Sequence, residues 1–163
     1  MIALGGCATV ATIPFPSGIF DQGPARTPVE LQAIQTREFE ADKRQVMSAL
    51  IAVFQDEGYR INQTDFDIGV VSATTPEEKQ FTEPTTILGL FESTIPFTSQ
   101  RTINAVVSEI SPSRSTLRIT MIVEAKTLSP AVAPYSGTDT NPERYQSIFA
   151  KIQQGLFLKK NLE

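Results

Sequence analysis

TLRITMIVEAKT, residues 116–127, is the stretch that decides the fold. Apolar and polar side chains alternate along it, with the period of a β-strand whose successive side chains point to opposite faces. One face carries Leu117, Ile119, Met121, Val123 and Ala125, and the other carries Arg118, Thr120, Glu124 and Lys126. We therefore expect a strand with one face buried in a core and the other largely solvated.

A partner strand is predicted just before this stretch, at 102–110. The residues between them, 111–115, read Ser-Pro-Ser-Arg-Ser, a Pro-containing turn that predicts an antiparallel hairpin. Further strands are expected at 36–40, 59–63 and 70–74.

Two helices are expected to cover one face of this sheet. The first is predicted at 43–57, where Asp42 and Gln45 form a capping-box pattern and Gly58 supplies the stop. The second begins at Asn141-Pro142, with Pro at the first helical position. Its apolar stripe consists of Tyr145, Ile148, Phe149, Ile152 and Leu156. The fold class is therefore α+β: one domain at 36–163, with an antiparallel four- to five-stranded sheet, two helices on one face and the order β-α-β-β-β-β-α.

Composition limits the chemistry of the chain. It has 163 residues, a net charge of −4 and no histidine. Clustered Lys and Arg are absent, which argues against nucleic acid as a partner. Without histidine, Ser-His-Asp and Cys-His catalysis and histidine-bound zinc are excluded. We expect no cofactor and no metal; an enzyme that relies on carboxylates, Lys or Tyr is the least supported class.

The pattern Asp65-x-Asp67-x-Gly69 resembles the start of a calcium-binding loop. An EF-hand loop that starts at Asp65 needs an oxygen ligand at its fifth position, glycine at its sixth and Glu at its twelfth, and this chain has Gly69, Val70 and Pro76 there. We interpret the stretch as a hairpin turn stabilised by its Asp side chains.

The single cysteine, Cys7, follows Leu4-Gly5-Gly6, and this order resembles a bacterial lipobox. The resemblance implies cleavage before Cys7, with 1–6 the remnant of a signal peptide and acyl chains on the thiol and the new amino group. Two or more chains make a stable anchor. A complete signal peptide needs a basic segment and a longer apolar stretch, so we expect a start upstream of Met1 or a trimmed sequence. The alternative is a free thiol in a disordered N-terminus.

The residue after the cysteine, Ala8, implies the outer membrane, because in the familiar sorting rule Asp at that position retains lipoproteins in the inner membrane. Residues 7–35 hold four prolines and two glycines, and we expect an extended tether there. Apolar residues within the tether, which could dock on this domain or on a neighbour, are Phe15, Ile19 and Phe20.

A second apolar segment lies at 87–97, broken by Gly89 and Pro96. It is either an irregular strand or packed loop that completes the core, or an exposed loop that binds a partner or touches lipid. Its candidate partner-binding residues are Ile87, Leu88, Leu90, Phe91, Ile95 and Phe97.

Two parts of the chain resemble a widespread family of poorly characterised bacterial outer-membrane lipoproteins. The first part is similar to a helix that ends in Gly-aromatic and a following Gly-x-Val-Ser-Ala strand of that family. It consists of VMSAL at 46–50, FQDEGYRI at 54–61 and DIGVVSAT at 67–74. NPERYQ at 141–146 and GLFL at 155–158 are similar to the closing helix of that family. The match covers most of 37–75 and 141–158. It implies a small helix-grip domain like those of outer-membrane machines, such as the BamC component of barrel assembly.

These observations predict a non-catalytic, lipid-anchored periplasmic subunit, structural or interacting, of an outer-membrane-associated envelope complex for secretion, transport or assembly. Its partners would be the inner leaflet of the outer membrane, through acylated Cys7, and other envelope proteins of a multi-subunit assembly. The alternative is a periplasmic binding module that holds a lipid or peptide ligand between sheet and helix; fold analogy alone supports it.

Overall fold

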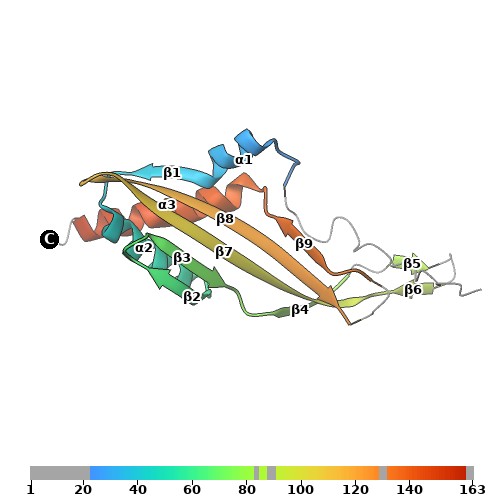
Figure 1. The fold of residues 1–163 in the computed structure, drawn as a ribbon. Helices are drawn as coiled ribbons and strands as arrows, with labels where there is room; N and C mark the ends of the chain where they lie inside the picture. The colour runs from blue at the N-terminus through green and yellow to red at the C-terminus, as the bar shows by residue number, and fades with distance from the viewer. Residues whose placement is uncertain (1–22, 83–84, 88–90, 129–131, 161–163) are drawn as a thin grey trace, which may run out of the picture.

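The structure, a computed structural model, describes residues 23–82, 85–87, 91–128 and 132–160 (Figure 1). In chain order the elements are α1 Pro28–Gln35, β1 Thr36–Phe39, α2 Lys43–Asp56, β2 Arg60–Asp65, β3 Val70–Thr74, β4 Glu78–Phe81, β5 Thr85–Ile87, β6 Phe91–Ser93, β7 Pro96–Ser111, β8 Arg114–Thr127, β9 Tyr135–Thr138 and α3 Pro142–Lys160. The predicted α+β class is confirmed.

The main sheet is antiparallel throughout, in the order β1-β8-β7-β3-β2. Beyond this path, β4 pairs with β7 and β9 pairs with β8, while β5 and β6 form a separate two-stranded sheet. The predicted hairpin is its centre, but β7 begins at Pro96 rather than at residue 102. The early start was missed because 98–100, Thr-Ser-Gln, is polar on both faces and shows no alternation.

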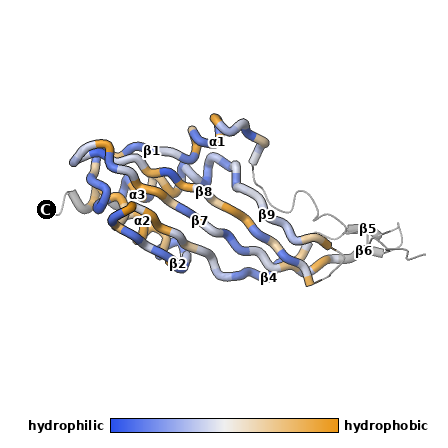
Figure 2. Tube along the Cα trace, viewed as in Figure 1, coloured by the Kyte–Doolittle hydropathy of each residue, from blue (hydrophilic) through white to orange (hydrophobic). Residues whose placement is uncertain are grey.

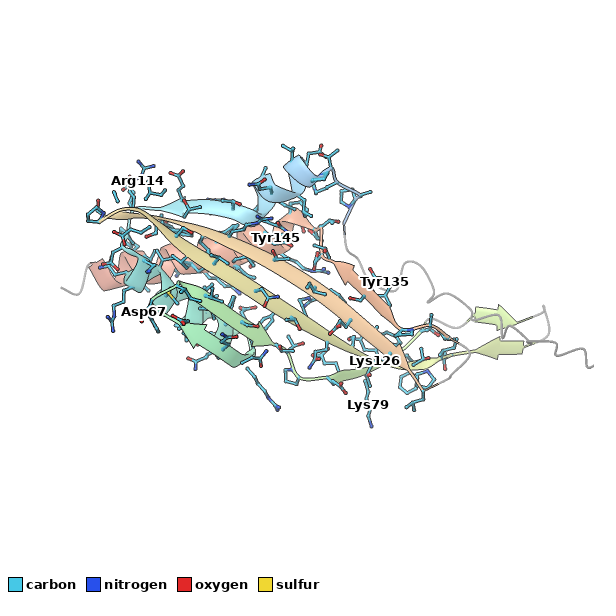
Figure 3. All side chains as sticks on the ribbon, in the orientation of Figure 1. Asp67, Lys79, Arg114, Lys126, Tyr135 and Tyr145 are labelled. Carbon is cyan, nitrogen blue, oxygen red and sulfur yellow. The ribbon has the colours of Figure 1, made fainter. Side chains whose placement is uncertain are left out.

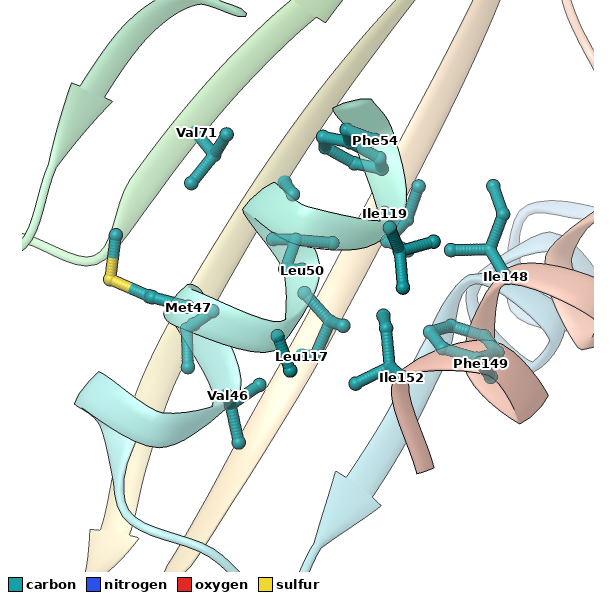
Figure 4. Packing of buried hydrophobic residues seen from close by; sticks show 14 of the residues in the cluster. Val46, Met47, Leu50, Phe54, Val71, Leu117, Ile119, Ile148, Phe149 and Ile152 are labelled. Atoms are coloured by element: carbon teal, nitrogen blue, oxygen red, sulfur yellow. The ribbon is translucent and has the colours of Figure 1, made fainter. Parts of the chain in front are cut away.

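The core lies between the sheet and two helices on one of its faces, as predicted (Figure 4). From the sheet, its buried side chains include Ile103, Ala105, Val107, Leu117, Ile119 and Met121. From α2 and α3 they include Val46, Met47, Leu50, Phe54, Tyr145, Ile148, Phe149 and Ile152. The alternation in β8 and the helical stripes thus meet in one apolar cluster, whose burial is the main stabilising term of the domain.

Helix α2 begins and ends as its sequence predicts. The Asp42 carboxylate accepts a hydrogen bond from Gln45 N at 2.8 Å, and Gln45 Oε1 accepts one from Asp42 N at 3.3 Å. This capping box satisfies two amide groups that the first turn leaves without helical partners. The helix ends at Asp56, and Gly58 takes a φ of 80°. That backbone region favours glycine, so the chain can turn sharply into β2.

The prediction of an extended tether as far as residue 35 is wrong for 28–35, which form α1. Thr27 caps this helix, Glu30 completes a second capping box, and Pro28 occupies its start. Residues before α1 are also fixed: Arg26 Nε donates to Thr140 O at 3.0 Å. The proline-rich composition hid a helix start that the Thr-Pro-x-Glu pattern encodes.

The turn between β2 and β3 is held by an aspartate, as predicted. Asp65 Oδ1 accepts hydrogen bonds from Asp67 N at 2.9 Å and Ile68 N at 3.1 Å. Gly69 closes the turn with a φ of 78°, and Val107 N of β7 donates to its carbonyl at 2.7 Å. A side-chain-capped turn therefore aligns β3 with the central hairpin.

Candidate functional site

The central hairpin extends past the helices that cover the rest of the sheet (Figure 1). We call this extension, made of β4, β9 and residues 96–101 and 122–128, the distal end. The remaining part, over which α2 and α3 lie, is the helix-covered half. Figure 2 shows hydrophobic segments of α2 and α3 gathered in the helix-covered half. The distal end is built from strands alone, and β5 and β6 lie beyond it.

Strands β5 and β6 contain residues 87 and 91–93 of the second apolar segment. The two strands pair antiparallel, with Ile87 opposite Phe91. The base is closed by Thr82 N donating to Ile95 O at 3.0 Å and Ile95 N donating to Thr82 Oγ1 at 2.8 Å. Neither strand joins the main sheet. Residues 87 and 91–93 therefore belong to a separate two-stranded sheet, whereas Pro96 and Phe97 of the same segment lie in β7 of the main sheet.

The other candidate partner-binding residues have different settings. Phe97 is 3% exposed, so its side chain is buried and offers no surface to a partner. The reason is its parity: Phe97 shares a face of β7 with Ile103, which lies in the core. Ile95 is half-buried. Cys7, Phe15, Ile19, Phe20, Leu88 and Leu90 lie outside the described residues.

The open face of the distal end carries an apolar row that sequence reasoning missed. Phe81 of β4 lies opposite Pro96 of β7, and the exposed fraction of Phe81 is 69%. Leu128, directly after β8 at the same end, is 88% exposed. Paired residues of neighbouring strands point to the same face. The row therefore depends on strand register, which the local pattern EKQF at 78–81 does not reveal.

Lysines lie next to this apolar row. Thr98 of β7 pairs with Lys79 on one side and with Lys126 on the other, and both lysines are exposed (Figure 3). Thr98 is two residues from Pro96, so the basic row and the apolar row share the open face. The next row inward pairs Gln100 with Glu124.

A buried polar junction joins β9 and β7 to the start of α3. The Asp139 carboxylate, whose side chain is fully buried, lies 2.5 Å from Arg144 Nη1 and 4.0 Å from Arg101 Nε. Its Oδ1 accepts a hydrogen bond from Asn141 N at 3.0 Å. Arg144 and the Asn141 amide thus both bind the Asp139 carboxylate within the fold. This junction holds α3 on the sheet.

Tyr145 completes the junction. Its hydroxyl donates to Asp139 O at 2.7 Å and accepts from Met121 N at 3.4 Å and from Gln35 Nε2 at 3.5 Å. Burial raises the pKa of Tyr145 above its ordinary value, although the hydrogen bonds from Gln35 and Met121 oppose the shift. Burial also raises the pKa of Tyr59, near Arg101. Both phenols therefore keep their protons at neutral pH.

Within 23–82, 85–87, 91–128 and 132–160, no group of three or more Cys, Asp or Glu lies close enough to hold a metal ion. In the same residues, no helix combines the length and apolar character that crossing a membrane requires.

Comparison with known proteins gives distant structural likenesses only. No family model and no curated protein matches this sequence. A DUF4468 family protein from Bacteroides ovatus has a TM-score of 0.44 at 10% identity, over 74% of this chain and 84% of that one. A TBP-like protein from Parabacteroides distasonis has a TM-score of 0.27 at 12% identity, over 78% of this chain and 85% of that one. Scores this low assign neither a family nor a function.

Proposed function

We propose that this protein is a non-catalytic interaction subunit of an outer-membrane-associated envelope complex, anchored by acylated Cys7 and facing the periplasm. The observation that carries the proposal is the β5–β6 hairpin, which is built outside the main sheet. Its sequence from Ile87 to Phe91 is Ile-Leu-Gly-Leu-Phe. An apolar segment that adds no strand to the main sheet is typical of a binding site for another molecule.

The physics of short hairpins supports a partner for this one. A two-stranded hairpin is marginally stable in water, because it cannot bury enough apolar surface to offset the entropy of ordering its chain. Paired strands of three residues each, as in β5 and β6, belong to this class. A protein partner that covers the hairpin would supply the missing burial, and the packed helix-covered half would hold the hairpin in position.

The non-catalytic part of the proposal rests on the ionisable groups of the described residues. Asp139 is engaged by Arg144, and Tyr145 is engaged by Asp139 O. Both groups have a structural use in holding α3. Together with the lack of histidine in the sequence, this leaves the described residues without an obvious nucleophile and base pair.

The alternative, a ligand held between sheet and helix, needs space at that interface. Leu50, Ile119 and Ile152 are all 0% exposed and belong to one buried cluster there. A lipid or peptide would have to displace side chains from a packed core, which costs several kcal/mol per large residue. Native mass measurement of the purified protein would reveal co-purified lipid and restore this alternative.

The anchor is tested by Cys7→Ser in protein expressed with a complete signal sequence in a host that lipidates. The substitution removes the acceptor thiol, so the product should move from the membrane fraction to the soluble periplasm. The wild type should carry two or three acyl chains by intact mass. An unmodified, soluble wild type would overturn the anchor.

The hairpin is tested by Leu90→Ser combined with Phe91→Ser. Co-purification of envelope proteins crosslinked in the native membrane should be lost, while the melting midpoint stays nearly unchanged. The matched control is Ile68→Ser combined with Ile110→Ser. These side chains, in the β2–β3 turn and near the end of β7 in the helix-covered half, are 64% and 49% exposed. A large loss of stability in the hairpin variant would make the segment core and leave the partner surface unassigned.

A further inference from the structure

The distal end presents its side chains in ordered rows across β4, β7 and β8. Phe81, Pro96 and Leu128 are exposed at its edge, and Lys79 and Lys126 flank Thr98 in the next row. Neighbouring strands lie about 4.8 Å apart, so the two lysine Cα atoms are about 10 Å from each other. Two long cationic side chains thus stand on either side of one strand, directly behind an apolar edge.

Within the described residues, no acidic residue pairs with a member of these two rows. Glu124 pairs with Gln100, one row further from the edge. Glu78 pairs with Ser99, which has the parity of Phe97, so it points to the other face of the sheet. On the open face, the row nearest the edge is therefore apolar, the next row is basic and the third row is acidic.

We propose that this edge contacts an anionic lipid surface, with Phe81 and Leu128 entering the headgroup region and Lys79 and Lys126 binding lipid phosphates. A bilayer interface favours this order: apolar groups lie at the boundary of the hydrocarbon, and lysines lie at the level of the headgroups. Lysine stems lie along apolar surface while their ammonium groups reach the phosphates. The row that contains Glu124 stays on the water side of the headgroups, where its repulsion from anionic lipid is weaker.

The inference rests on the membrane location in the proposed function, and the length of the chain is compatible with it. The described chain begins at Gly23, whose backbone lies beside Asn141 at the start of α3. Residues 8–22 can span at most about 50 Å when fully extended. An acyl group on Cys7 and the distal edge can therefore reach the same bilayer.

The test uses the full chain with Cys7→Ser. This substitution removes any acyl anchor, so the remaining membrane binding can be assigned to the edge. Sedimentation with phosphatidylglycerol vesicles should show binding that weakens as salt rises, and phosphatidylcholine vesicles should bind far less. Lys79→Gln combined with Lys126→Gln should weaken binding about 30-fold, given the usual contribution of a lysine near an anionic surface. The control pair, Lys43→Gln with Lys151→Gln, makes the same change in net charge in the helix-covered half and should alter binding less than threefold.

The apolar edge is tested on its own. Phe81→Ser combined with Leu128→Ser should weaken vesicle binding at least tenfold, because two large side chains can no longer be buried in the interface. Ile68→Ser with Ile110→Ser should leave it unchanged. The lipid contact would be overturned if the distal variants and their control variants lost vesicle binding equally. It would also be overturned if the protein did not bind phosphatidylglycerol vesicles. Neither result affects the Cys7→Ser fractionation, so the inference and the proposed function fail separately.

Discussion

The helix-covered half and the distal end place their large apolar side chains differently. In the helix-covered half, Ile103 and Ile119 are fully buried beneath α2 and α3. At the distal end, Phe81 is exposed on the open face, and Leu128 is exposed directly after β8. Stability is therefore concentrated where two layers meet, and the distal end can vary its surface at little cost in stability. Substitutions in the two parts should separate folding from binding.

The largest effect is expected in the helix-covered half. Phe149 is 2% exposed and packs against Phe39 with ring centroids 6.3 Å apart. Phe149→Ala should lower the free energy of unfolding by about 3–5 kcal/mol, through lost burial and the cavity left behind. Urea denaturation measures this. Lys151→Ala, on an exposed ion pair with Glu57, should change it by less than about 0.5 kcal/mol. Equal, small losses would mean that α3 does not cover the sheet.

Two turn glycines of the helix-covered half differ in how closely the rest of the protein packs around them. Gly69 has a φ of 78°, and a Cβ there would meet the Val107 carbonyl oxygen at 2.1 Å. Gly69→Ala should therefore cost about 2–4 kcal/mol, since the left-handed backbone and the collision with β7 add together. Gly58 has a φ of 80° with nothing within 4 Å, so Gly58→Ala should cost only about 1 kcal/mol. Similar losses in thermal melts would show that β7 yields at this contact.

Tyr145 tests the junction between the two parts. Tyr145→Phe removes the donor to Asp139 O and should cost about 1–3 kcal/mol. Because burial raises the pKa of Tyr145, the folded protein keeps a proton that the unfolded chain loses near pH 10. The stabilisation is thus fully present below about pH 10 and is lost as pH rises further. As pH rises above about 10, the variant should lose less stability than wild type, and parallel curves would contradict this role.

Elements that carry their own local pattern could be predicted from the sequence. Alternation revealed β8, and capping residues together with an apolar stripe revealed α2 and α3. Strands β4 and β9 were missed. The sequence of β4, EKQF, is exposed at every position and shows no alternation. Their pairing is decided by the length of β7 and β8, which is a non-local property.

The candidate site was harder to predict for the same reason. The apolar density around Phe97 was visible, but the face on which it lies depends on where β7 begins. Lys79 and Lys126 are far apart in sequence and become neighbours only through Thr98. A row across three strands has no counterpart in local periodicity. Register therefore supplies the information that the sequence pattern lacks.

The smallest effect on stability should come from the distal edge. Phe81 and Leu128 expose 69% and 88% of their surface, so replacing both with Ser removes little buried area. We expect a change of less than about 0.5 kcal/mol in the free energy of unfolding by urea. The same variant should bind phosphatidylglycerol vesicles at least tenfold more weakly, since the lost area is buried only against lipid. A loss of 2 kcal/mol or more would instead show that the edge is packed within the folded domain, and the separation of folding from binding would fail.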